Sequence, residues 1–156
     1  MNNSLYIARP TPNFRRIFLA FLLTILGSMG VRAAESTLYT RLGGYDAISA
    51  VVDDFASQLF ADPKLQKFFG GMSLDSQKKF KQHNVELVCG ATGGPCPYLG
   101  RDMETSHNGL KITNQDFDAV GGHLVQTLDK FKVPKKEREE LLSIVERLRP
   151  AIVEQK

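Results

Sequence analysis

Apolar residues recur at intervals of three and four through most of the chain, which is the spacing of amphipathic helices. No stretch after residue 34 alternates apolar and polar residues for long enough to predict a half-buried strand. Glycine and proline separate the predicted segments. A short helix precedes Gly43-Gly44, and further helices are predicted at residues 46–60, 62–69, 74–91, 102–108, 113–131 and 134–153. The pattern therefore predicts one all-α domain.

The first 33 residues have a different character. Arg9, Arg15 and Arg16 precede an apolar run at residues 17–31, and small residues follow at the positions that a signal peptidase reads. This order is typical of a secretory signal peptide, and the run is short for a membrane span of ~20 residues. We therefore predict a signal peptide at residues 1–33, a domain at 34–156 and export to the periplasm. The alternative is an uncleaved membrane anchor, and Arg15-Arg16 leaves both general and twin-arginine export open.

Removal of the signal changes the charge of the protein. The whole chain carries a formal net charge of +3, and residues 1–33 hold four arginines and no acid, so the mature chain has a net charge of −1. Nucleic-acid binding, which needs a clustered basic face, gains no support. Cys89 and Cys96 could pair in an oxidising compartment, but the sequence leaves this open. Without a neighbouring histidine they do not form a zinc site.

The segment at residues 74–91 carries an unusual apolar stripe. Helical phase predicts that its buried face holds Phe80, His83, Asn84, Leu87, Val88 and Ala91. His83 and Asn84 are polar, and burying such groups costs about 1–3 kcal/mol each unless they find partners. Hydrogen bonds within the core would satisfy them, and so would a bound group on this face.

His107 adds a second candidate ligand, 24 residues after His83, on a short segment that follows a glycine-rich loop. Neutral imidazole is a good ligand for iron, and a proximal histidine holds haem iron in globins. Several aromatic side chains could wall a flat porphyrin, although each could equally be a core residue: Phe55, Phe68, Phe69, Phe80 and Tyr98.

The residues that carry a family resemblance span about 38–153. They are Leu38-Tyr39-Thr40-Arg41-Leu42-Gly43-Gly44, Phe55, Ala61-Asp62-Pro63, Phe68-Phe69, Gly93-Gly94-Pro95 with Tyr98, Met103-Glu104-Thr105-Ser106-His107, Gly109, Ile112-Thr113, Phe117 and Gly122-His123-Leu124. With these segments the chain resembles a group I truncated haemoglobin, a two-over-two helical globin. The resemblance implies a haem cofactor with His107 as the proximal iron ligand. It also implies haem contacts from Phe55, Phe68, Phe69, Phe80, His83, Asn84, Leu87, Tyr98, Met103 and Ile112.

The chain departs from this family at the distal side of the expected pocket. Ala56 stands where many members carry a tyrosine that donates to bound oxygen, which argues against very tight oxygen binding by that route. Some members bind iron through a histidine at the position of His83, and Asn84 stands where relatives often have glutamine. Two alternatives follow. Either His83 is a second iron ligand, or it points to solvent and Asn84 donates to the gas. His123 is expected to be structural.

Three classes of function fit these residues. The first is reversible binding of oxygen, nitric oxide or carbon monoxide at a His-ligated haem, with oxidation of nitric oxide as an enzymatic variant that needs an external reductase. The second is a six-coordinate, bis-histidyl haem for electron transfer or sensing. The third is a helical partner-binding module without a cofactor, which gives no reason for His83, Asn84 and His107 together. A c-type attachment motif is missing from the sequence, so we expect non-covalent haem b.

Overall fold

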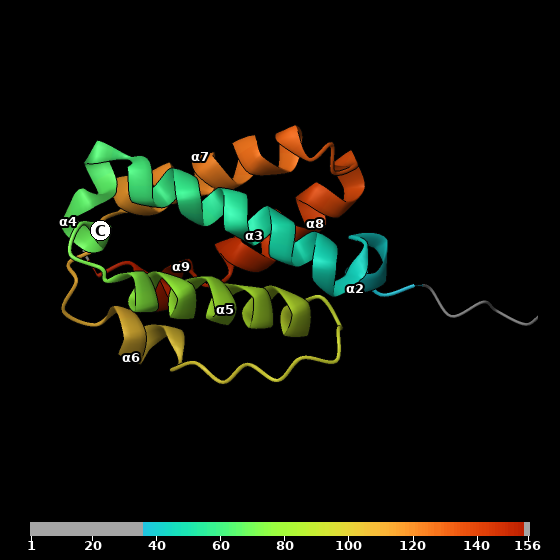
Figure 1. The fold of residues 1–156 in the computed structure, drawn as a ribbon, viewed down its shortest axis with the longest axis horizontal. Coiled ribbons are helices and arrows are strands. Elements are labelled where there is room, and N and C mark those ends of the chain that lie inside the picture. Colours follow the sequence, from blue (N-terminus) through green and yellow to red (C-terminus); the bar gives the residue numbers. More distant parts are fainter. Residues whose placement is uncertain (1–35, 155–156) are drawn as a thin grey trace, which may run out of the picture. The chain divides into compact units, whose positions relative to one another are not determined.

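The computed structural model describes residues 36–154, so the predicted signal peptide at 1–33 lies outside the described residues. The described part is helical and contains no strand (Figure 1). None of its helices is both long and apolar enough to cross a membrane. The elements are α2 (Leu38–Arg41), α3 (Gly44–Ala61), the 3₁₀ turn η1 (Pro63–Leu65), α4 (Gln66–Phe69), α5 (Leu74–Ala91), α6 (Met103–His107), α7 (Asn114–Lys130), α8 (Lys135–Glu146) and α9 (Arg149–Ile152).

Two glycines make the sharp turn between α2 and α3. Gly43 has a φ of +94° and Gly44 a φ of +78°, a left-handed conformation that costs glycine little and other residues more. The turn lets α2 fold back against α8, where Arg41 forms ion pairs with Glu137 at 3.0 Å and with Glu140. The predicted break at this glycine pair is therefore confirmed.

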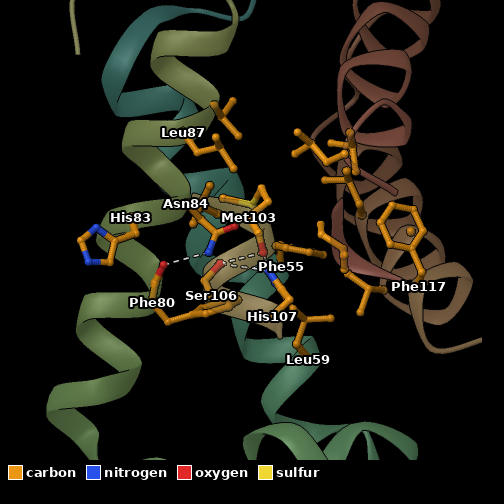
Figure 2. A pocket seen from close by; sticks show the side chains of 18 of the residues that line it. Phe55, Leu59, Phe80, His83, Asn84, Leu87, Met103, Ser106, His107 and Phe117 are labelled. Carbon is orange, nitrogen blue, oxygen red and sulfur yellow. Dashed lines mark hydrogen bonds between the residues drawn. The ribbon is translucent and has the colours of Figure 1, made fainter. Parts of the chain in front are cut away.

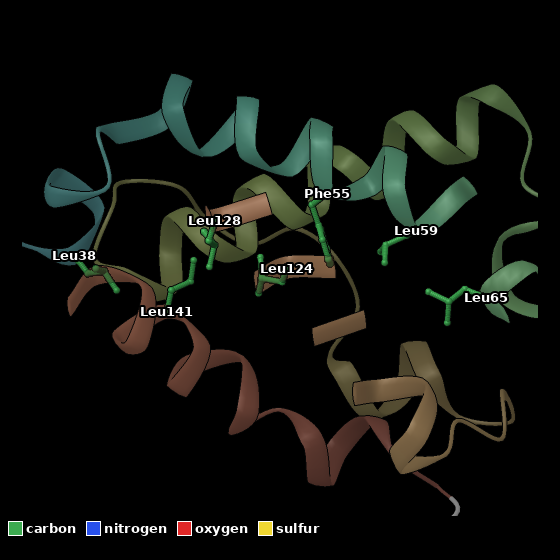
Figure 3. Close-up of a cluster of buried hydrophobic side chains, with 7 residues drawn as sticks. All are labelled: Leu38, Phe55, Leu59, Leu65, Leu124, Leu128 and Leu141. Atoms are coloured by element: carbon green, nitrogen blue, oxygen red, sulfur yellow. The ribbon is translucent and has the colours of Figure 1, made fainter. Parts of the chain in front are cut away.

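Helix α3 is the centre of the fold and packs against both α5 and α7, while α7 also packs against α8. Helices α3 and α5 run in opposite directions, as the colour gradient of Figure 1 shows. A cluster of buried side chains from α2, α3, η1, α7 and α8 forms the core (Figure 3) and comprises Leu38, Phe55, Leu59, Leu65, Leu124, Leu128 and Leu141. Complete burial of one such side chain contributes about 1.5–3 kcal/mol, so this cluster accounts for much of the stability.

Helix α7 follows an N-cap threonine with an acidic residue three positions later, which is a common pattern at helix N-termini. The Thr113 hydroxyl accepts a hydrogen bond from the Asp116 amide at 3.2 Å, and the Asp116 carboxylate accepts one from the Thr113 amide at 3.0 Å. This is a capping box, which satisfies amides that the first helical turn leaves without partners. The helix predicted at residues 113–131 is confirmed, with Thr113 as its N-cap.

The C-terminal segment differs from its prediction as one helix over 134–153. The structure ends α8 at Glu146 and begins the separate α9 at Arg149. Pro150 explains the break, because it has no amide hydrogen for the carbonyl of Glu146 and its ring would clash with that carbonyl in a continuous helix.

The buried face of α5 also needs a correction. Its bounds agree with the prediction, but Ala91 is exposed, and the buried residues of this helix are Val85 and Cys89. Val85 packs with Ile48 and Val52 of α3. The face that was predicted to be buried is therefore only half-buried along Phe80, His83, Asn84, Leu87 and Val88, because it borders a cavity instead of solid core.

Candidate functional site

A cavity of about 590 Å³ lies among these helices, a size that suits a small-molecule or cofactor site. Its wall contains all of the residues that the sequence analysis assigned to the cofactor: Phe55, Phe68, Phe69, Phe80, His83, Asn84, Leu87, Tyr98, Met103, His107 and Ile112. The structure thus brings these residues together, and their contacts with a cofactor stay a prediction.

His107 enters the cavity from the short helix α6 (Figure 2). Asp102 caps this helix by accepting a hydrogen bond from the Thr105 amide at 2.8 Å, and this bond lowers the pKa of the Asp102 carboxyl. The Nδ1 atom of His107 lies 2.7 Å from the carbonyl oxygen of Met103 and 3.0 Å from the hydroxyl of Ser106. When Nδ1–H donates to that carbonyl, Nε2 is the unprotonated nitrogen, which is how a metal-ligating histidine is commonly held.

Phenylalanine rings form one end of the cavity wall. The rings of Phe69 and Phe80 lie 5.5 Å apart edge to face, and Phe60 packs against both at 5.6 Å. Phe55 is 8% exposed and belongs to the core cluster as well as to the cavity wall. The two interpretations of these aromatics, core and cofactor wall, are therefore compatible. Phe60 was not predicted for the site, and it packs against the wall residues Phe69 and Phe80 without lining the cavity itself.

His83 and Asn84 are adjacent in α5 but lie on different sides of it (Figure 2). The Asn84 amide nitrogen donates to the Phe80 carbonyl at 2.9 Å, and the side chain faces the cavity. The His83 ring points away, is 43% exposed and places Nδ1 3.3 Å from a carboxylate oxygen of Glu86. The outward position of His83 and the inward position of Asn84 are those of the second alternative of the sequence analysis, and a contact between Asn84 and a gas stays a prediction.

Glu86 lies beneath the loop that leads to α6. Its side chain is 12% exposed, and its pKa is lowered chiefly by a hydrogen bond from Gln82, with further contributions from His83 and the Leu99 amide. Burial and the negative charges of Glu86 and Asp102 raise the pKa of the nearby Tyr98 hydroxyl, which donates to the Arg101 carbonyl at 2.8 Å. The hydroxyl of Tyr98 is therefore neutral at physiological pH.

Ala56 contributes nothing to the cavity, because it is completely buried within α3 and lies outside the cavity wall. The opposite wall comes from α7 and α8, through Val120, Leu124 and Val145. These residues were not predicted for the site, since their helical spacing is the same as that of ordinary core residues. Arg101 at the wall was also missed, as a single exposed arginine in a loop carries no sequence signal.

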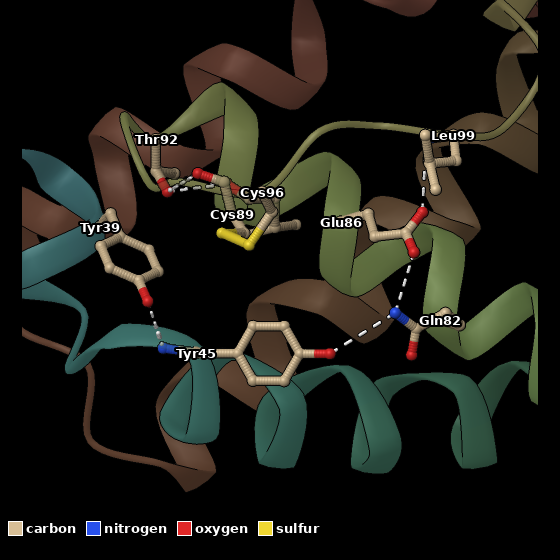
Figure 4. The surroundings of a disulfide bond; sticks show 9 residues. Tyr39, Tyr45, Gln82, Glu86, Cys89, Thr92, Cys96 and Leu99 are labelled. Atoms are coloured by element: carbon tan, nitrogen blue, oxygen red, sulfur yellow. Dashed lines mark hydrogen bonds between the residues drawn. A yellow bond between two sulfur atoms is a disulfide. The ribbon is translucent and has the colours of Figure 1, made fainter.

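A disulfide joins Cys89 of α5 to Cys96 in the following loop (Figure 4). The sequence analysis left this pairing open. Gly94 lies inside the closed loop, where an added Cβ atom would come within 2.6 Å of the Cys89 sulfur and 2.5 Å of the Tyr39 ring. The bond therefore fixes the start of the loop that carries Tyr98 and leads to His107.

His123 lies between α7 and α3, outside the cavity wall. Its Nε2 atom is 2.7 Å from the Asp62 carboxylate and its Nδ1 atom 3.3 Å from the Gln58 side-chain oxygen. The hydrogen bond from His123 is the main cause of the lowered pKa of Asp62. These contacts agree with the structural role expected for this histidine.

The described part of the chain offers no cluster of ligands for a bare metal ion. Within residues 36–154, no group of three or more His, Cys, Asp or Glu side chains could hold one. A single oriented imidazole in an apolar cavity suits a metal that is already coordinated by a porphyrin, as haem iron is in globins.

Comparison with known proteins agrees with this interpretation. The family model of bacterial-like globins matches residues 37–154. A group 1 truncated haemoglobin of Mycolicibacterium paratuberculosis is 36% identical over 121 residues, which cover 78% of this chain and 87% of that protein. The crystal structure of a truncated haemoglobin from Tetrahymena pyriformis in the Fe(III) form has a TM-score of 0.70 and 27% identity, covering 76% and 98% of the two chains.

A third similar protein is the two-over-two haemoglobin of Synechococcus, whose structure in the cyanomet state has covalently attached haem. It has a TM-score of 0.70 and 29% identity, with coverage of 77% and 100%. The fold is therefore the truncated two-over-two globin fold, and the predicted fold class is confirmed. This chain belongs to the bacterial-like globin family.

Proposed function

We propose that this chain binds haem in its cavity through Nε2 of His107 and takes up a diatomic gas on the opposite side of the ring. The observation that carries the proposal is the orientation of His107, whose Nδ1 is bound to the Met103 carbonyl at 2.7 Å inside an apolar cavity of about 590 Å³. Membership of the globin family supports it. When bound, ferrous haem supplies an iron atom with one position open to oxygen, nitric oxide or carbon monoxide.

The protein residues act on ligand binding in three ways. His107 holds the iron, and the phenylalanines exclude water, which protects ferrous iron from side reactions. Asn84 is the polar group that faces the cavity from α5, and its amide can donate to a polar gas. Because Ala56 has no donor, we propose that Asn84 alone replaces the distal tyrosine of similar proteins and that oxygen binding is moderate and reversible.

We propose that the cofactor is haem b, held without a covalent bond. The chain contains three histidines and no c-type attachment motif. His107 is assigned to the iron, and His123 is engaged by Asp62 and Gln58 away from the cavity. His83 points outward, which favours a gas-binding site over the six-coordinate electron-transfer alternative.

Oxidation of nitric oxide is an extension of this proposal. Bound haem would supply the one electron that the conversion of nitric oxide and dioxygen to nitrate requires, and an external reductant would have to replace that electron. We also propose that the mature protein begins after residue 33 and works outside the cytoplasm, free in the periplasm or held by its N-terminal segment. The basic and apolar order of residues 9–31 supports export.

The test is a titration of the mature chain with haem, followed by spectra of the reduced protein with and without carbon monoxide. We expect one haem per chain, a five-coordinate ferrous spectrum and a reversible change with the gas. The His123→Gln variant is the matched control, because it alters a histidine outside the cavity and should bind haem like the wild type. A folded wild type that takes up no haem would contradict the proposal.

A further inference from the structure

The carboxylate of Glu86 in α5 contacts three other groups. It accepts hydrogen bonds from the Gln82 amide at 2.9 Å and the Leu99 main-chain amide at 3.4 Å (Figure 4). The same oxygen that faces Leu99 lies 3.3 Å from Nδ1 of His83. A solvated helix pair would leave the acid exposed, whereas this side chain is only 12% exposed. Glu86 therefore has a fixed position.

The His83 ring is held on its outer side by two groups. Glu86 meets its Nδ1 atom, and the Tyr98 ring packs edge to face against it with the ring centroids 6.1 Å apart. Yet His83 also belongs to the cavity wall, next to Asn84. The backbone of α5 therefore places this imidazole at a border, from which the ring can be directed outward to Glu86 or inward to the cavity.

The loop that carries Tyr98 and Leu99 is tied to the same helix. The Cys89–Cys96 disulfide closes its first part, and the Leu99 amide bonds to Glu86. The helix, through Glu86, and the loop, through Tyr98, thus both contact the partly exposed ring of His83, and Glu86 also bonds to the loop. These contacts distinguish the pair of Glu86 and His83 from an ordinary solvent-exposed pair of residues spaced by three on a helix.

From these contacts we propose that Glu86 is a positioning residue that holds His83 outside the cavity and so keeps the sixth coordination position of the haem iron open for gas. The proposal rests on haem binding at His107. A neutral imidazole that loses its outer partner is a good iron ligand, so the two positions of His83 compete. The contact between Glu86 and His83 is partly exposed. Its loss should therefore change the ratio of iron-bound His83 to outward-pointing His83 by roughly three- to tenfold.

The test compares ferrous, gas-free spectra of haem-loaded wild type, Glu86→Gln, Glu86→Ala and the double variant Glu86→Ala/His83→Ala. We expect the ratio of six- to five-coordinate haem to rise three- to tenfold in Glu86→Ala and less in Glu86→Gln, which keeps one acceptor oxygen. The double variant should be five-coordinate again. Glu139→Ala is the matched control, because Glu139 is an exposed acid that pairs with Lys135 within α8, outside the cavity wall.

Rapid mixing with carbon monoxide gives a second readout. The six-coordinate fraction should appear as a slow binding phase, because His83 must leave before the gas binds, and the double variant should lose that phase. The inference is overturned if haem-loaded Glu86→Ala and Glu86→Gln keep the wild-type ratio, if the rise persists without His83, or if wild type is already six-coordinate through His83. A wild type that takes up no haem overturns the proposed function and this inference together, which distinguishes the two failures.

Discussion

The Nδ1 atom of His107 lies 2.7 Å from the carbonyl oxygen of Met103, one helical turn earlier in α6. Since α6 spans only Met103–His107, this bond sets the ring orientation within a single turn that Asp102 caps. The Asp102 cap and the Met103 carbonyl therefore orient the ring of His107, whose proposed role is to ligate the haem iron.

Asn84 should slow the escape of oxygen. Asn84→Leu keeps a side chain of similar size but removes the donor that faces the cavity. Loss of one hydrogen bond of about 1.4 kcal/mol should accelerate oxygen dissociation roughly tenfold. Stopped-flow measurement of oxygen release checks this, with Gln126→Leu, an exposed amide outside the cavity wall, as the control. An unchanged release rate in Asn84→Leu would show that Asn84 does not contact the gas.

Gly94 should tolerate no side chain. An alanine there would place its Cβ atom 2.8 Å from the Cys89 carbonyl oxygen, a main-chain atom that cannot move aside easily. We expect Gly94→Ala to lower the free energy of unfolding by about 1–3 kcal/mol. Urea denaturation measures this change. Gly71→Ala is the control, because no heavy atom lies within 4 Å of its added Cβ atom, and equal stability losses in the two variants would refute the steric explanation.

The Cys89–Cys96 disulfide should stabilise the folded chain by restricting the unfolded one. For cysteines seven residues apart, the loop-closure contribution is about 2–3 kcal/mol. Reduction should lower the free energy of unfolding by this amount, as measured by urea denaturation with and without a reductant. The variant with serine at both positions should have the stability of the reduced protein and no response to the reductant. A reductant effect that persists in this variant would assign it to another cause.

Asp62 should make stability depend on acid pH. Its hydrogen bond with His123 holds its pKa below the ordinary value of 3.8. The folded state therefore gains stability from the carboxylate that is fully present above about pH 3.8 and is lost as the pH falls through the lower folded pKa. Asp62→Asn keeps an N-cap side chain for η1 but removes the charge.

We expect the stability difference between wild type and Asp62→Asn to shrink as the pH falls below about 3.8. Thermal unfolding between pH 2 and 7, followed by circular dichroism, tests this expectation. A difference that grows as the pH falls would have the wrong sign.

The sequence predicted those features that short segments determine. The hydroxyl of Thr113 and the acid of Asp116 lie three residues apart, so their capping box needs no tertiary information. The break at Pro150 is also local, and the prediction of one continuous helix overlooked it. The apolar stripe predicted the residues along the cavity but not that Val85 and Cys89 are the buried ones, because only the packing of α3 shows where core ends and cavity begins.

The positions of His83 and Asn84 show more clearly what the sequence could not predict. His83 and Asn84 are 100° apart on an ideal helix, so periodicity alone allows either side chain to face the ligand. The choice depends on Glu86, Tyr98 and the loop at residues 92–102, which the disulfide ties to α5. Such contacts between a loop and a helix depend on three-dimensional arrangement, which the spacing of residues does not specify.

The central claim is that His107 holds haem iron, and its most direct measurement is the spectrum of His107→Gly with haem, before and after the addition of free imidazole. We predict that the variant folds, binds haem weakly and loses the axial signature of the wild type, and that imidazole in the vacated space restores it. A His107→Gly protein that retains its haem with wild-type axial coordination, without added imidazole, would contradict the account.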